Sequence, residues 1–306
     1  MNHHSSISKQ PTDIQFYSDG VKCRAYLYRP DSQQTPMPII IMAHGLGGTR
    51  KMRLTAFAER FVAAGYACLV FDYRHFGDSE GQPRQLLDID RQLKDWKAAI
   101  AYARNLPNID NNKIILWGSS FSGGHVLVTA AQDSNIRAVI SQCPFTDGLA
   151  SSLAMNPVIS AKLTALALRD RIGAAFGNAP VMVPLSAPPG KTALMNASDA
   201  HSGSLELTKY DPDYKNYVAA RFALDIIRYY PGHQTSKIKA PVLFCVCETD
   251  TVAPSKATLR HAKRTPQKEI KLYHYGHFEI YIGGAFEHVV KDQIDFLKRT
   301  VPVNHV

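Results

Sequence analysis

Short apolar runs alternate along the chain with segments whose apolar residues recur every three or four positions. The runs have the length and composition of strands buried on both faces, and they are 38–43, 66–71, 113–117, 136–143, 241–247 and 269–275. The segments with helical spacing are 54–62, 88–103, 120–132, 254–263 and 286–298. Strand–helix alternation of this kind predicts a mostly parallel sheet with helices on both faces. An aromatic-rich alternating segment, 21–29, precedes it and is typical of an antiparallel edge strand or hairpin arm.

The alternation stops in the middle of the chain. Residues 144–238 instead contain a probable helix near 150–169, a stretch rich in Pro, Gly, Ser and Ala, and a second helical region near 217–229. We therefore predict an α/β core of about eight strands in two parts, 1–143 and 239–306, with a mostly helical inserted cap at 144–238.

Composition agrees with a globular protein that has a sizeable core. The chain has 306 residues, of which 45% are hydrophobic and 20% charged, and this balance excludes disordered, collagen-like and coiled-coil chains. No apolar run approaches the ~20 residues needed to span a bilayer, and the first residues are polar. We expect a cytoplasmic protein with no membrane partner.

The charge balance is basic but diffuse. Lys and Arg number 35 against 26 Asp and Glu, giving a formal net charge of +9. A basic excess can indicate a nucleic-acid partner. Because these residues are scattered and no run of five occurs, we expect no nucleic-acid partner. The expected partner is a small acyl substrate, for the reasons given with the catalytic candidates below, and a homodimer is left open.

The cysteines predict neither a disulfide framework nor a zinc site. They are five, an odd number, and each lies in or at the end of a strand-like segment: Cys23, Cys68, Cys143, Cys245 and Cys247. The C-x-C pair lacks the usual zinc spacing. Buried, reduced thiols are the expected state.

The strongest chemical signal is the stretch WGSSFSGGH, 117–125. A buried strand runs into Gly118 and Ser120 and a helix follows at once, as in a nucleophile elbow that exposes a serine above a sheet. The stretch departs from G-x-S-x-G because Ser122 stands at the fifth position. We favour Ser120 as nucleophile over Ser122, and over the alternative that these residues only cap a helix.

A serine nucleophile needs a base and an orienting carboxylate, expected in the order Ser, Asp or Glu, His. Asp250 follows the strand at 241–247, and His277 follows the strand at 269–275. The loops after parallel strands open at the same sheet edge, so both residues should meet Ser120. We predict a catalytic triad of Ser120, Asp250 and His277.

Other residues compete for these roles. Glu248 is expected to remain on its strand, whereas Asp147, after the fourth buried strand, stays open as an alternative acid. His274 is expected to pack within its strand. The pair His277 and Glu279 reads H-x-E, but no C-x-x-C follows, so we expect no metal site.

A glycine-rich loop, HGLGG at 44–48, follows the strand at 38–43. Attack on an ester places negative charge on the carbonyl oxygen, which two fixed N–H groups must stabilise. We predict that Leu46 and Phe121 supply this oxyanion hole and that His44 braces the loop.

The same loop permits a second interpretation, a dinucleotide-binding fingerprint with Asp72 at the end of the next strand. Arg50 stands where the third glycine belongs, and this interpretation leaves the triad candidates unexplained. We therefore expect no cofactor.

With these residues in place, the chain resembles the α/β-hydrolase superfamily over nearly its whole length, and more narrowly the dienelactone-hydrolase-like and polyketide-transferase-like hydrolases. The matching segments are FYSDGVKCRAYLYRP, HGLGGTR, FDYRHFGDSEGQPR, WGSSFSGGH, CPFTDG, CETDTVAP and YGHFEIY. The resemblance implies the same triad and oxyanion hole, and a loop at 74–81 near the site. Dienelactone hydrolases proper use cysteine, whereas this chain has serine.

The predicted function is hydrolysis of a carboxylic ester or thioester through an acyl-enzyme on Ser120. Acyl transfer or peptide cleavage by the same triad is the alternative, and a non-catalytic binding protein is a third possibility. The cap is expected to supply an apolar acyl pocket from residues that include Met155, Leu163, Leu166, Phe176, Met182, Leu194 and Met195.

Overall fold

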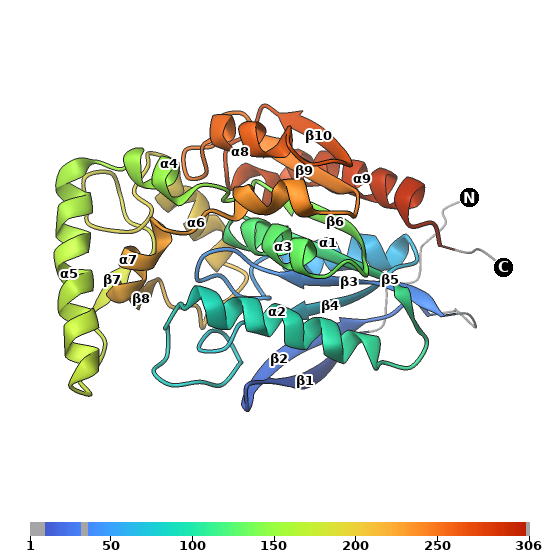
Figure 1. Ribbon diagram of the computed structural model, residues 1–306, viewed down its shortest axis with the longest axis horizontal. Helices are drawn as coiled ribbons and strands as arrows, with labels where there is room; N and C mark the ends of the chain where they lie inside the picture. Colours follow the sequence, from blue (N-terminus) through green and yellow to red (C-terminus); the bar gives the residue numbers. More distant parts are fainter. Residues whose placement is uncertain (1–9, 32–35, 304–306) are drawn as a thin grey trace.

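The computed structural model describes residues 10–31 and 36–303 and is built on an eight-stranded sheet (Figure 1). The strand order is β1-β2-β4-β3-β5-β6-β9-β10; β2 is antiparallel to both of its neighbours, β1 and β4, and the pairs from β4 to β10 are all parallel. The strands are β1 (Thr12–Ser18), β2 (Val21–Tyr28), β3 (Met37–Ala43), β4 (Ala67–Phe71), β5 (Ile109–Ser119), β6 (Ile136–Gln142), β9 (Val242–Cys247) and β10 (Lys268–Tyr273). The predicted strand number and parallel core are confirmed, and β2 is the inner arm of a hairpin whose other arm, β1, forms the edge.

Helices cover both faces of the sheet because β3, β4 and β6 are buried along nearly their whole length, as is the second half of β5, and they have no face that can meet water. One apolar cluster joins α2 and α3 to the sheet, and a second joins α1 and α9 to the opposite face. The core helices are α1 (Leu54–Ala63), α2 (Ile89–Arg104), α3 (Phe121–Gln132), α8 (Ser255–Ala262) and α9 (Gly283–Thr300).

Residues 144–238 add no strand to the main sheet and extend beyond its edge on one side of Figure 1. They form α4 (Gly148–Leu153), α5 (Pro157–Ala175), β7 (Met182–Pro184), α6 (Ala200–Thr208), β8 (Tyr217–Ala219), η1 (Ala220–Phe222), α7 (Ala223–Ile226) and η2 (Pro231–Lys237). The helical character predicted near 150–169 is confirmed, but its continuity is wrong: two helices cover this range, because Asn156 caps a new helix at Pro157. The second predicted helix, at 217–229, is also wrong in large part, since it opens with a strand paired to β7. The division into core and cap stays a prediction.

This inserted segment leaves and rejoins the core at one place. The N–H of Gly148 donates to the carbonyl of Tyr229 at 2.9 Å, and the N–H of Gly232 donates to the carbonyl of Thr146 at 2.9 Å. These two bonds form a neck between the strands β6 and β9, which are themselves neighbours in the sheet.

All five cysteines are free and buried, as predicted. Within the described part of the chain, none of the helices combines the length and apolarity needed to cross a bilayer.

Candidate active site

Ser120 lies at the sharp turn between β5 and α3. Its backbone has a positive φ of 57° and ψ of −119°, a conformation that costs a non-glycine residue free energy and is maintained by its surroundings. Its N–H donates to the carbonyl of Gln142 and its carbonyl accepts from the N–H of Phe145, each at 2.9 Å. A side chain at Gly118 would meet the backbone of Ser122 at 2.2 Å, so this tight turn requires glycine there.

The three predicted triad residues meet at this turn. His277, in the loop after β10, lies with Nε2 2.9 Å from the Ser120 hydroxyl, and its Nδ1 lies 2.7 Å from the Asp250 carboxylate. Asp250 follows β9, and its other oxygen accepts from the N–H groups of Val252 and Ala253 at 2.8 and 2.6 Å. The result is a continuous line of hydrogen bonds from hydroxyl to imidazole to carboxylate.

Electrostatics adjust the imidazole in this line. Burial alone would lower the pKa of His277, but the adjacent Asp250 carboxylate more than offsets that effect and raises the pKa well above its ordinary value. Both side chains are almost fully buried, so their attraction is little screened by water. An imidazole in this setting takes up a proton readily, which suits a base that must accept one from a hydroxyl.

The structure separates the competing residues from this line. Asp147 caps α4, where it accepts from the N–H of Ala150, and its carboxylate faces His261 at 3.6 Å. Glu248 lies just past the end of β9 and pairs at the surface with His274 at 2.9 Å. The expectation that Glu248 stays on its strand and that His274 packs is therefore wrong, since the His274 side chain is 88% exposed. Strand β10 ends one residue earlier, at Tyr273.

Ser122 is likewise occupied. Its hydroxyl donates to the carbonyl of His44 at 2.6 Å and contacts the hydroxyl of Tyr73. Ser122 therefore ties the serine turn to the glycine-rich loop instead of facing the imidazole.

The glycine-rich loop lies directly against the serine turn. A Cβ atom on Gly45 would meet that of Ser120 at 2.6 Å, so only glycine permits this approach. Leu46, next along the loop, lines a cavity together with Ser120 and Phe121. Phe121 is the first residue of α3, and an N–H at that position has no partner within the helix. Both predicted oxyanion-hole residues thus adjoin the serine, and their role is proposed below.

His44 braces this loop in the expected way. Burial lowers its pKa to about 4, so the ring is neutral at pH 7. Its Nδ1 accepts from the N–H of Gly45 at 2.8 Å, and its Nε2 lies 3.1 Å from the Met52 carbonyl, to which it donates. The ring also stacks on Tyr281, with centroids 5.5 Å apart.

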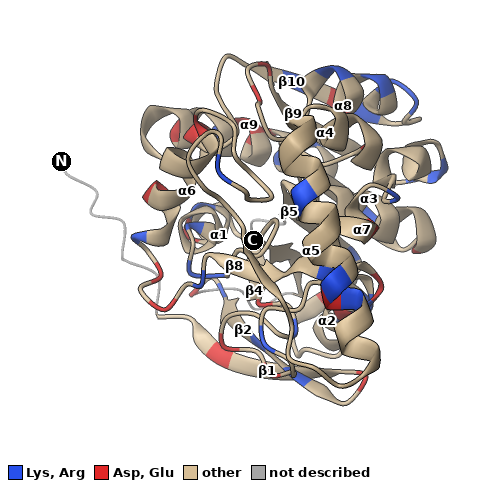
Figure 2. Ribbon diagram, turned by 90° about the vertical axis from the view of Figure 1, so that its left-hand side faces the viewer, with Lys and Arg blue, Asp and Glu red and all other residues tan. Residues whose placement is uncertain are grey.

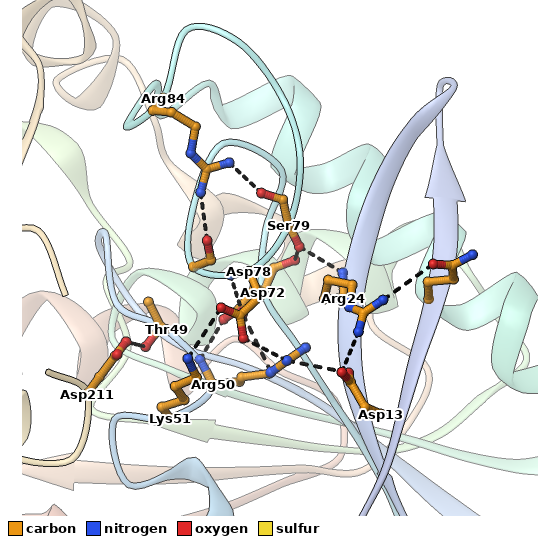
Figure 3. A network of polar contacts seen from close by, with 12 residues as sticks. Asp13, Arg24, Thr49, Arg50, Lys51, Asp72, Asp78, Ser79, Arg84 and Asp211 are labelled. Atoms are coloured by element: carbon orange, nitrogen blue, oxygen red, sulfur yellow. Dashed lines mark hydrogen bonds and ion pairs between the residues drawn. The ribbon is translucent and has the colours of Figure 1, made fainter. Parts of the chain in front are cut away.

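A charged network supports the same loop from behind (Figure 3). The Asp72 carboxylate accepts from the backbone N–H groups of Arg50 and Asp78, at 2.7 and 3.2 Å. The Arg50 side chain is fully buried, bonds to Asp78 at 2.9 Å and covers the Tyr26 ring. Asp72 is therefore committed within the protein, an arrangement that gives no support to the dinucleotide interpretation. The loop at 74–81 helps hold the glycine-rich loop through Asp78.

The cavity beside the serine is bounded mainly by the inserted segment. It has a free volume of about 720 Å³ counted out to its mouth, and four predicted pocket residues line it: Met155, Leu163, Leu194 and Met195. Leu166 packs against the core cluster, and Phe176 and Met182 are exposed. Ser151, Ser152, Ser160 and Thr164 add a polar wall that the sequence analysis did not identify.

Comparison with known proteins decides the family. The family model for serine aminopeptidase, S33, matches residues 34–282, which is most of the chain. The chain belongs to this family of α/β hydrolases. This assignment confirms the superfamily inferred from the motifs and supports hydrolase activity.

Relatives and solved structures of α/β hydrolases agree with the assignment. The quorum-quenching protein AidA of Acinetobacter baumannii is 69% identical over 299 residues, which cover 98% of each chain. The thiohydrolase aneE of Aspergillus aculeatus is 27% identical over 305 residues, covering 95% of this chain and 93% of that protein. The structure of DcsB in complex with its substrate analogue superposes with a TM-score of 0.82 at 25% identity and covers 95% of this chain and 100% of that one. The narrower likeness to dienelactone hydrolases stays a prediction.

In this α/β hydrolase one further residue, which the sequence analysis expected only as a core thiol, lies beside Asp250 and His277. The Cys143 thiol, just after β6, lies with the ligand atoms of Asp250 and His277 in a group spanning no more than 4.8 Å. These three residues could contact a metal ion, but both ring nitrogens of His277 are already engaged. The arrangement therefore suits proton transfer better than metal coordination. The position of Cys143, at the end of a strand beside the serine turn, is the signal that could have identified it.

Proposed function

We propose that this protein is a serine hydrolase that cleaves carboxylic esters or thioesters through an acyl-enzyme. The Ser120 hydroxyl attacks the acyl carbon while its proton passes to Nε2 of His277. The negative charge that develops on the carbonyl oxygen is met by the N–H groups of Leu46 and Phe121. His277 then protonates the departing alcohol or thiol, and the Asp250 carboxylate stabilises the imidazolium throughout.

Deacylation repeats the same steps with water as nucleophile. Water loses a proton to His277, adds to the acyl carbon, and expels Ser120, which recovers its proton. The observation that carries the proposal is the continuous line of 2.9 and 2.7 Å contacts joining Ser120, His277 and Asp250. A hydroxyl is a weak nucleophile on its own, and this line supplies the base and the orienting carboxylate that it needs.

The inserted segment is proposed to act as a cap that binds the acyl group. Apolar side chains such as Met155 and Leu163 line the cavity that begins at Ser120. An apolar acyl chain would lose water contact there, which favours binding in proportion to the area buried. The similarity to a quorum-quenching protein and to a thiohydrolase supports an acyl ester or thioester of this kind.

Acyl transfer is the second candidate. Several full-length relatives are polyketide transferases, among them ATR5 of Stachybotrys chlorohalonatus at 26% identity. The same acyl-enzyme would then pass its acyl group to an alcohol or amine instead of water. Turnover with added acceptor alcohols or amines, analysed for ester or amide product, separates the two reactions.

Active-site labelling tests the nucleophile. We expect a fluorophosphonate probe to modify Ser120, and Ser120→Ala to lose both labelling and p-nitrophenyl acetate turnover by a factor of up to ~10⁶. Ser134→Ala is the matched control, because Ser134 is an exposed turn residue between α3 and β6. Near-normal turnover in Ser120→Ala, or a phosphonate adduct mapped to Ser122, would contradict the proposal.

A further inference from the structure

Exposed apolar side chains gather on the outer surface of α4 and α5. The described residues include 13 exposed large apolar side chains, and six of these lie in this one segment: Leu149, Leu153, Val158, Leu168, Ile172 and Phe176. Scattered exposed apolar residues are ordinary on a soluble protein, whereas a concentration of them indicates a docking surface.

Four of these residues, in and just after α5, make a continuous stripe together with two exposed alanines. We call this set the α5 face, and it consists of Val158, Ala161, Ala165, Leu168, Ile172 and Phe176. Their spacing of three or four residues places them on one side of a helix. The opposite side of α5 buries Ile159, Leu163 and Ala167 against the rest of the protein. Helix α5 thus has two apolar sides: one is packed against the rest of the protein, and the other, the α5 face, is exposed.

Cations border the α5 face on one edge. Lys162 and Arg169, seven residues apart, share that edge by helical periodicity, and both are exposed. No ion pair involves either of them among the residues that the structure describes. The other charges of α5 are paired, Asp170 with Arg221 and Arg171 with Asp225. Figure 2 looks onto α5 and shows the basic positions along it.

The opposite edge of the α5 face adjoins the proposed acyl cavity. Ser160 and Thr164 line that cavity, and they also line an outer groove with Ala161, Ala165 and Leu168. The groove on the α5 face therefore adjoins the wall of the cavity, and an apolar acyl chain that lies on the α5 face is next to that wall. The apolar stripe lies between the cations on one edge and the substrate cavity on the other.

We infer that the α5 face docks on an anionic phospholipid bilayer, where the enzyme takes acyl esters or thioesters dissolved in the lipid. This inference rests on the proposed function. An apolar helix side bordered by unpaired cations fits such a surface, because the apolar residues enter the acyl boundary while the cations meet lipid phosphates. It departs from the expectation of no membrane partner, which rested on the absence of a spanning apolar run and on the scattered basic residues.

A second copy of the chain fits this face less well. A twofold antiparallel pairing centred on Ala165 would bring Lys162 of one copy next to Arg169 of the other, with no carboxylate between them. Like charges held close together oppose association. Anionic lipid supplies the missing negative charge.

Vesicle sedimentation with the full chain tests the inference. We expect binding to vesicles of phosphatidylcholine and phosphatidylglycerol, weak binding to phosphatidylcholine alone, and loss of binding at high salt. The double variant Leu168→Ser/Ile172→Ser should lower the partition coefficient by roughly tenfold or more. Lys162→Gln/Arg169→Gln should lower it by roughly fivefold for each cation removed.

Leu272→Ser is the matched control, since Leu272 is an exposed leucine on β10, away from the inserted segment. It should bind vesicles like the wild type, and all variants should retain the wild-type circular dichroism and turnover of water-soluble p-nitrophenyl acetate. Equal vesicle binding by Leu168→Ser/Ile172→Ser and by the wild type would overturn the inference. Vesicle binding that does not depend on lipid charge would also overturn it. So would sedimentation velocity that shows a dimer for the wild type and a monomer for Leu168→Ser/Ile172→Ser.

The vesicle measurement is independent of turnover. Ser120→Ala should sediment with anionic vesicles like the wild type, because Ser120 lies outside the α5 face. If Ser120→Ala retained turnover while Leu168→Ser/Ile172→Ser lost vesicle binding, the proposed mechanism would be contradicted and the docking surface would be supported. The reverse pattern would remove the docking surface and leave the mechanism intact.

Discussion

The serine turn and the wall of the inserted segment are built in opposite ways. At the turn, polar atoms are buried and partnered: the Ser120 hydroxyl, both nitrogens of His277 and the Asp250 carboxylate all have hydrogen bonds. Along α5, by contrast, apolar side chains such as Ile172 and Phe176 face outward. The first region fixes the positions of individual polar atoms through hydrogen bonds, and the second supplies apolar area and volume. Substitutions should therefore act on reaction rate in one region and on selectivity or docking in the other.

After the loss expected for Ser120→Ala, the largest effect separates the two candidate acids. Asp250→Asn should lower kcat by roughly 10³–10⁴-fold, because the amide no longer stabilises the imidazolium. Asp147→Asn should leave kcat close to normal, since Asp147 caps α4 and faces His261 instead. Steady-state kinetics with p-nitrophenyl acetate measures both. A large loss in Asp147→Asn with a small one in Asp250→Asn would reverse the assignment.

The pH profile sharpens the same comparison. His277 must be neutral to act as base, and Asp250 raises its pKa, so kcat/KM should rise with pH through a midpoint above 6.5. In Asp250→Asn that rising limb should move to lower pH, because the raising charge is gone. A limb that stays in place would show that another group titrates.

Removing the buried cation behind the glycine-rich loop should affect stability. Arg50→Ala leaves the buried Asp72 carboxylate without its ion pair, a change that typically costs about 3–5 kcal/mol. Burial already raises the pKa of Asp72 to about 6. A raised pKa in the folded state means that stability is held at low pH and lost as pH rises, so the deficit should be larger at pH 8 than at pH 5. Urea unfolding at both values measures it.

Lys51→Ala is the control for that experiment. Lys51 pairs at 3.3 Å with Asp78, which is also a partner of Arg50, but Lys51 is partly exposed. Ion pairs exposed in this way contribute only about 0–1 kcal/mol to stability. Equal losses in the two variants would mean that burial of Arg50 has no special effect.

Filling the cavity should change selectivity and not chemistry. Met155→Trp should reduce kcat/KM for long acyl esters by roughly 10–100-fold while acetate esters change little, because only long chains need the occupied volume. Met182→Trp is the matched control, as Met182 is exposed and lies outside the cavity lining. A series of p-nitrophenyl esters of graded length measures the change; an equal loss on all lengths would contradict a cavity for the acyl chain.

The smallest effect concerns His274. Its pair with Glu248 is at the surface, so His274→Ala should change the free energy of unfolding by no more than ~1 kcal/mol and leave turnover unchanged. A marked loss of turnover would give His274 a role that its exposed position does not support.

The core could be predicted from sequence because its signals are local and redundant. The buried part of β5, residues 114–117, is a continuous apolar run, and the turn after it shows glycine and serine together. Loops after parallel strands meet at one edge, which brought Asp250 and His277 to Ser120 without any knowledge of distance.

The inserted segment offered no such rule. The break between α4 and α5 depends on the Asn156 side chain capping the N–H of Val158, a signal that the apolar spacing hides. The segment at 217–229 has helical spacing but begins as a strand, because a partner in β7 satisfies its backbone. His274 faces water because β10 ends one residue before it. A local cap decided the first outcome, a distant strand partner the second and the end of a strand the third.

The neck at Gly148 and Gly232 has an evolutionary consequence. Two backbone bonds bring the ends of a long excursion together between adjacent strands, so the excursion begins and ends at nearly one point. Recombination at this neck can replace the segment between Gly148 and Gly232 as one piece, and Ser120, Asp250 and His277 lie outside the piece that is replaced.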